Sequence, residues 1–106
     1  MDAPVFAALA HPIRRNLLVN LAAKSPLTAT QLAREYPMTR QGILKHLQIL
    51  EMASLVVVNQ NGREKRYSLT PAPLREVDQW IEEISHTWDE RLLRLKAFIE
   101  DGPAGE

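Results

Sequence analysis

The stretch that decides the fold runs from Thr28 to Leu50 and reads TATQLAREYPMTRQGILKHLQIL. Thr28 is followed three residues later by Gln31, which is the capping-box pattern of a helix start. Tyr36–Met38 then predicts a turn, and Thr39 is placed to cap a second helix. Two short helices around a tight turn are typical of a helix-turn-helix, whose second helix enters the major groove of DNA.

The second helix is expected to bury Ile43, Leu47 and Leu50, which recur at helical spacing. Its polar surface would reach base edges and phosphates, and the alternative is an ordinary solvated helix face. For His46 a phosphate contact and a capping or packing role both stay open. The residues of this segment that are predicted to contact DNA are Thr39, Arg40, Gln41, Leu44, Lys45, His46 and Gln48.

A β-hairpin is predicted directly after this helix. Leu55–Val58 is an apolar, largely β-branched run, and the Asn61-Gly62 pair that follows is a strong hairpin signal. If Asn61-Gly62 forms a two-residue loop, Val56 opposes Tyr67, and strand alternation turns both toward the core. A hairpin that follows a helix-turn-helix is the wing of a winged helix.

Three basic residues, Arg63, Lys65 and Arg66, cluster near the tip of the expected wing. They are candidates to bind phosphates or to enter the minor groove. The alternative is a charged hairpin that protects its own strand edges from other chains. Leu44, on the preceding helix, is expected either to meet a thymine methyl group or to pack beneath this wing.

Helices are also expected on both sides of this unit. Val5–Ala10 reads as a short helix, His11-Pro12 is placed to start the next, and Ser25-Pro26 is placed to end it. At the other end, residues 71–99 read as one helix of more than 25 residues.

The apolar residues of this long last helix recur in steps of three and four, close to a heptad seam. So long a helix exceeds what a small domain covers, so its apolar face requires a partner, most economically a second copy of the chain. Residues 71–99 are therefore assigned as a dimerisation helix within a single domain of residues 1–106. The interface residues expected on it are Leu74, Val77, Ile81, Ile84, Trp88, Leu92 and Leu95.

Composition restricts the partners. The chain has no cysteine, which excludes disulfides, thiolate metal sites and cysteine nucleophiles together. Its net charge is zero, but residues 34–70 carry six basic and three acidic side chains, whereas residues 71–106 carry four basic and nine acidic ones. A basic middle favours nucleic acid as a partner, and the alternative is a chance fluctuation of surface charge. We expect neither a signal peptide nor a membrane span, and hence a cytoplasmic location.

No enzyme is predicted. The sequence has no glycine-rich phosphate loop, no Glu/His metal spacing and no nucleophile with a base at a suitable distance. The acidic residues of the last helix are expected to form a solvated face, with a site for a hard metal ion as the minor alternative.

A set of short motifs follows in order along the chain: Leu9–Arg15, Gln31–Ala33, Lys45–Leu47, Leu50-Glu51, Leu55-Val56, Gly62-Arg63 with Tyr67 and Leu69, and Pro73-Leu74 with Trp80 and Trp88. With this set the chain resembles the arsenic-repressor-like (ArsR/SmtB) winged-helix transcriptional regulators over nearly its whole length. The resemblance implies a homodimer joined through its first and last helices, which adds Phe6 and Leu9 to the expected interface. It also implies a repressor that occludes a promoter.

The metal-binding residues usual in that family are missing from this sequence. The family's thiolate motif would place cysteines where Thr28 and Thr30 stand, and its terminal-helix site would pair Asp78 with a histidine where Trp80 stands. A second histidine of that site would fall near Arg91. Hydroxyl and indole groups are poor ligands for transition metals. No metal and no cofactor is therefore predicted, and the inducer is unidentified.

The sequence thus predicts a mainly α fold with a small β-hairpin, a winged helix-turn-helix in the order α-α-α-α-β-β-α. Its expected function is that of a dimeric regulator that binds double-stranded DNA sequence-specifically, a repressor acting on an inverted-repeat operator. One alternative is a winged-helix protein-interaction module without sequence-specific DNA binding. Another is a metal-responsive repressor that uses ligands other than cysteine.

Overall fold

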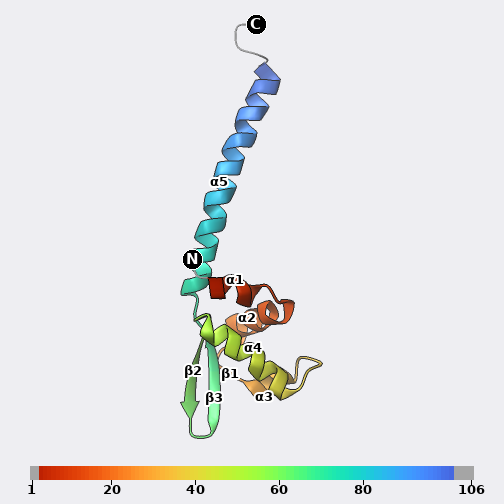
Figure 1. Ribbon diagram of the computed structural model, residues 1–106, viewed down its shortest axis with the longest axis vertical. Coiled ribbons are helices and arrows are strands. Elements are labelled where there is room, and N and C mark those ends of the chain that lie inside the picture. Colours follow the sequence, from red (N-terminus) through yellow and green to blue (C-terminus); the bar gives the residue numbers. More distant parts are fainter. Residues whose placement is uncertain (1–2, 102–106) are drawn as a thin grey trace. The chain divides into compact units, whose positions relative to one another are not determined.

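The computed structural model describes residues 3–101 (Figure 1). They form two compact units, one that ends at Leu74 and one that starts at Arg75. The elements are α1 (Ala3–Leu9), α2 (Pro12–Lys24), β1 (Leu27–Thr28), α3 (Ala29–Ala33), α4 (Arg40–Met52), β2 (Val56–Asn61), β3 (Glu64–Leu69) and α5 (Ala72–Asp101). This order confirms the predicted winged helix-turn-helix fold and adds one element, β1.

The predicted helix starts are confirmed by side-chain hydrogen bonds. His11 caps α2, because its Nδ1 accepts the backbone N–H of Ile13 at 3.2 Å. Thr28 and Gln31 form a complete capping box at α3, in which each side chain accepts the other residue's backbone N–H. Thr39 caps α4. Each cap satisfies a backbone donor that a helix start leaves without a partner in the helix.

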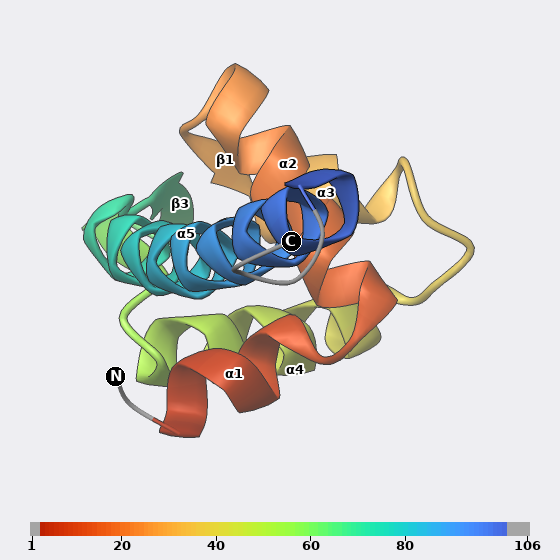
Figure 2. The same ribbon diagram turned by 90° about the horizontal axis from the view of Figure 1, so that it is seen from above.

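The core of the first unit lies between α1, α2, α3, α4 and the sheet. Figure 2 shows α1 lying alongside α4, and each of the two helices contributes buried side chains. The predicted inner face of α4 is confirmed, since Ile43, Leu47 and Leu50 are fully buried. Among the described residues, Leu17, Leu21, Leu32 and Leu55 are also buried almost completely.

Gly42 on α4 lies close to a neighbouring side chain. That neighbour belongs to the turn before the helix, because a Cβ at position 42 would lie 3.1 Å from Cε of Met38. A larger residue there would have to displace this methionine from the N-terminal turn of α4.

The wing contains a third strand that the sequence did not predict. β1 pairs antiparallel with β3, with Leu27 opposite Tyr67, so that the strand order is β1-β3-β2. A strand of two residues is too short to show an alternating pattern, which is why periodicity missed it.

The predicted register of the hairpin is wrong by two residues. Val56 opposes Leu69 rather than Tyr67, and Asn61 and Glu64 are the last strand pair, so that the loop is Gly62-Arg63. Gly62 has a φ of 66°, and it occupies the first loop position, where a glycine with positive φ is favoured in two-residue hairpins. The shift by two residues preserves the faces, so Val56 and Tyr67 are buried as predicted.

The C-terminus of α4 is closed by a residue that sequence signals did not mark. Ser54 has a φ of 59°, and its N–H donates to the carbonyl of Glu51 at 2.9 Å. The N–H of Leu55 donates to the carbonyl of Leu50 at 2.9 Å. These are the two hydrogen bonds of a Schellman motif, and serine occupies the left-handed position where glycine is usual. The motif leads the chain directly into β2.

The second unit consists of α5 from Arg75 onward. Its apolar side chains are largely exposed in the single chain, among them Ile81, Ile84, Trp88 and Leu92. Within residues 3–101, no helix combines the length and the apolar character that a membrane crossing requires.

Candidate nucleic-acid interface

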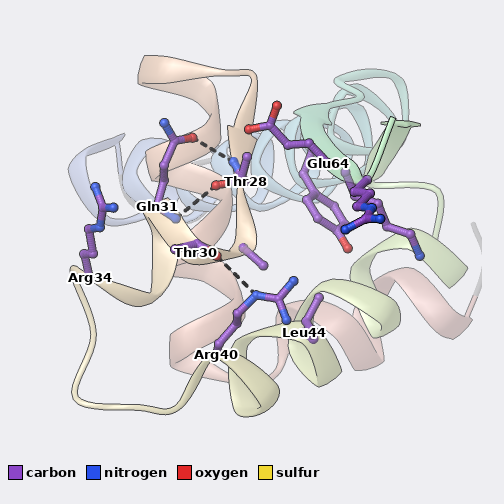
Figure 3. Close-up of a pocket in the computed structure, with 11 residues that line it drawn as sticks. Thr28, Thr30, Gln31, Arg34, Arg40, Leu44 and Glu64 are labelled. Atoms are coloured by element: carbon purple, nitrogen blue, oxygen red, sulfur yellow. Dashed lines mark hydrogen bonds between the residues drawn. The ribbon is translucent and has the colours of Figure 1, made fainter. Parts of the chain in front are cut away.

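The helix-turn-helix and the wing enclose a groove of about 660 Å³ (Figure 3). Helix α3, helix α4 and the hairpin each contribute to its lining. Four basic side chains line it, namely Arg34, Arg40, Arg63 and Lys65, and all four are exposed. The groove therefore presents a concentrated positive charge, which suits a polyanion such as a phosphate backbone.

The single carboxylate in the lining does not cancel this charge. Glu64 is held by the guanidinium of Arg66, whose Nη2 lies 3.0 Å from Oε2. Arg66 itself is not among the lining residues. Of the three basic residues predicted near the tip of the wing, the structure thus places Arg63 and Lys65 on the groove and pairs Arg66 with an acidic neighbour.

Six of the seven residues predicted at α4 and its N-cap fall into three groups. Arg40 and Leu44 line the groove, which places Leu44 beside the wing. Gln41, Lys45 and Gln48 are exposed on the same helix. Because successive residues of a helix are rotated by about 100°, these three side chains form a stripe next to the one formed by Arg40 and Leu44. Thr39 is the N-cap, so its hydroxyl is already used by the backbone N–H of Gly42 at 3.0 Å.

His46 belongs to none of these stripes. Its ring lies 4.7 Å, centroid to centroid, from the ring of His11, and its Nδ1 lies 3.3 Å from Nη1 of Arg14. Since an arginine only donates, Nδ1 accepts and the ring is neutral with its proton on Nε2. Arg14 also donates to the carbonyls of Ala8 at 2.8 Å and Ala7 at 3.0 Å, at the end of α1. The structure favours the packing role of His46 over a phosphate contact.

We expect His46 to make stability depend on pH. Burial, and then the neighbouring His11 and Arg14, lower the pKa of His46 below its ordinary value of 6.5. The unfolded chain therefore takes up the proton first as the pH falls. The contribution of neutral His46 is complete above about pH 6.5 and is lost as the pH falls through the lowered pKa.

Urea unfolding at several pH values between 5 and 8 measures this effect. His46→Asn keeps an oxygen that accepts from Arg14 but does not titrate, so its stability should decrease less between about pH 6.5 and 5. Parallel pH profiles for the two proteins would show that His46 does not contribute.

The floor of the groove includes Tyr67 of β3, which is buried. Burial raises the pKa of Tyr67, Glu51 raises it further, and Arg40 offsets part of the increase. The phenol is therefore neutral at physiological pH and adds no negative charge to the basic lining.

The residues expected at a dimer interface are found in both units. In the first, Leu9 and Leu74 line an apolar hollow of about 260 Å³ together with Leu18 and Leu69, and Phe6 is partly exposed on α1. In the second, the expected residues of α5 from Val77 to Leu95 are exposed or half-buried in the single chain. Between residues 3 and 101, no three His, Asp or Glu side chains come together as a metal site would require.

Two groove residues were missed by sequence reasoning. Arg34 was counted among the basic residues, but no motif singled it out. Thr30 was noted only as a place where relatives carry a thiolate, whereas its Oγ1 accepts a hydrogen bond from Nε of Arg40 at 3.2 Å. Both reach the groove because α3 folds against α4 and the wing, which local patterns do not reveal.

Comparison with known proteins agrees with this geometry. A family model described as a helix-turn-helix domain matches residues 9–59. The transcriptional repressor SdpR of Bacillus subtilis is 30% identical over 77 residues, which are 73% of this chain and 84% of SdpR. An ArsR-like transcriptional regulator from Rhodococcus sp. RHA1 superposes with a TM-score of 0.80 and 37% identity over 95% of this chain and 92% of the other. The chain belongs to the ArsR family of helix-turn-helix transcriptional regulators.

A further match to a transcriptional regulator is partial. The HTH-type transcriptional regulator Rv2034 of Mycobacterium tuberculosis is 37% identical over 67 residues, and the match spans 63% of this chain and 62% of that protein. These relatives are regulators of transcription and not enzymes, which confirms that part of the sequence-based prediction. Membership of the ArsR family also confirms the resemblance predicted from the sequence.

Proposed function

We propose that this ArsR-family regulator binds double-stranded DNA through the groove between α3, α4 and the wing, and that it represses transcription by covering a promoter. The observation that carries this proposal is the basic lining of the groove, where four cations stand against one carboxylate that Arg66 already neutralises. Helix α4 would lie in the major groove, and Arg63 at the turn of the wing would bind the adjacent backbone.

The proposed functional form is a cytoplasmic homodimer joined by α1 and α5. The apolar residues of α5, which are exposed in the single chain, support the dimer. The relative SdpR, which is named a repressor, supports the proposed repression. Two copies related by a twofold axis would place their α4 helices in successive major grooves, about 34–36 Å apart, and would read an inverted repeat. Residues 71–99 would then be the dimerisation helix of a single-domain protomer.

The proposal predicts different effects for the wing and for α4. Arg63→Ala should weaken binding to every duplex by a similar factor and reduce the slope of log K against log salt by about 0.9, as for one lost phosphate contact. Gln41→Ala should instead change which duplex is preferred, because glutamine reads base edges, most often adenine. Fluorescence anisotropy on several duplexes, taken from a selection of bound sequences out of random DNA, measures both effects.

Lys24→Ala is a matched control, because Lys24 is an exposed cation outside the lining of the groove. It should change neither the salt slope nor the preference. A chain that selects no duplex from random DNA at low salt would contradict the proposal, and stable capture of a protein partner in its place would favour an interaction module.

A further inference from the structure

Arg40 differs from the other arginines on the groove in how it is held. It is the first residue of α4, and Nε donates to Oγ1 of Thr30 on α3 at 3.2 Å. In the part of the chain that the structure describes, its Nη1 and Nη2 groups have no hydrogen-bond or ion-pair partner. Arg34 and Arg63 have no hydrogen bond that fixes their guanidinium within the same residues. The guanidinium of Arg40 is thus held through Nε, and its Nη1 and Nη2 groups remain available to a ligand.

The hydrogen bond between Thr30 and Arg40 does not compete with the capping of α3. The capping box of α3 is made by Thr28 and Gln31, so the hydroxyl of Thr30 is not needed to start the helix. Figure 3 shows Thr30 and Arg40 joined across the groove, with Leu44 one turn further along α4. The hydrogen bond removes rotamers that a free arginine would lose on binding, so the side chain is preorganised before DNA arrives.

The open end of the guanidinium determines what it recognises. Nη1 and Nη2 together form a planar fork of donors, which matches the two acceptors N7 and O6 that guanine presents in the major groove. Adenine presents one acceptor and one donor there, and cytosine presents a donor, so neither accepts the fork. The N-terminal residues of a recognition helix are those that reach base edges, and Arg40 is in that position.

We propose, on the basis of the DNA-binding function above, that Arg40 reads one guanine in each half-site and that Thr30 is the positioning residue that aims it. Discrimination for this guanine should be about 5- to 150-fold against other bases, as for a bidentate arginine contact. Phosphate contacts fall to Arg63 and Lys65 on the wing, whose side chains are not restrained in this way.

The test uses the full chain and a duplex obtained by selection from random DNA. Each guanine of the half-site is replaced in turn by 7-deazaguanine, which lacks the N7 acceptor and retains base pairing. For the wild-type protein, one position should lose affinity markedly. For Arg40→Ala the same replacement should have no effect, because the group that reads N7 is already absent.

Thr30 is tested by its effect on discrimination rather than on affinity alone. Thr30→Val keeps the shape but removes the acceptor, and it should reduce the preference for that guanine several-fold with an unchanged melting temperature. Thr30→Ser retains the hydroxyl and should restore the preference.

Three results would overturn this inference and leave the proposed DNA-binding function standing. Equal losses for wild type and Arg40→Ala at every 7-deazaguanine would exclude the guanine contact. If Arg40→Ala lost affinity equally for every duplex and had a reduced salt slope, Arg40 would be a phosphate contact. Unchanged discrimination in Thr30→Val would exclude the positioning role. A chain that selects no duplex overturns the proposed function itself, and this inference with it.

Discussion

Replacing Leu47 by alanine is expected to lower the free energy of unfolding by about 3–5 kcal/mol. Leu47 is fully buried on α4, a helix that contacts α1, α2, α3 and β2. The neighbouring side chains are held by these elements and cannot move into the space that the smaller side chain leaves. The free energy lost to this cavity therefore adds to the free energy lost with the buried surface. A domain of this size is stabilised by about 5–15 kcal/mol, so the loss is a large fraction of the total.

Urea unfolding followed by circular dichroism measures this change. Met52→Ala is the control, because Met52 lies on the same helix and has a side chain of similar size but is 83% exposed. It should change stability by less than about 0.5 kcal/mol. If Leu47→Ala lowered stability by less than 1 kcal/mol, α4 would not be packed as the structure has it.

The parts of the fold that sequence predicted depend on neighbours in the chain. The caps at His11, Thr28 and Thr39 and the inner face of α4 follow from patterns within four residues. The features that sequence missed need partners far along the chain or an unusual backbone. β1 exists only because β3 lies beside it, and Ser54 adopts a left-handed conformation with no glycine to mark it.

The same distinction applies to the groove. Arg40, Leu44, Arg63 and Lys65 were predicted from the helix and hairpin that carry them. The roles of Thr30 and His46 depend instead on contacts between elements, with Arg40 in one case and with His11 and Arg14 in the other. Residue spacing identifies which side chains share a surface, whereas packing determines which of them are already bound to a neighbour.

Ile84→Glu on α5 is expected to convert the proposed dimer into monomers. Ile84 lies on the apolar stripe of the helix and is 49% exposed in the single chain, so the proposed interface would cover it. A carboxylate buried there without a partner costs about 2–5 kcal/mol in each copy. Because both copies carry the substitution, the dissociation constant should rise by roughly a thousandfold or more. Sedimentation velocity across a range of protein concentrations measures the change.

Gln79→Glu is the matched control, because it adds the same charge outside the apolar stripe of α5, about 140° around the helix from Ile84. It should leave the dimer intact. The monomer formed by Ile84→Glu should keep its helical circular dichroism, since the core of the first unit does not include position 84, and yet lose most of its affinity for an inverted repeat. Each half-site would then bind alone, without the effective concentration that a second linked α4 supplies. A folded wild-type chain that sediments as a monomer at micromolar concentration would contradict the assignment of α5, and the exposed stripe would need a different partner.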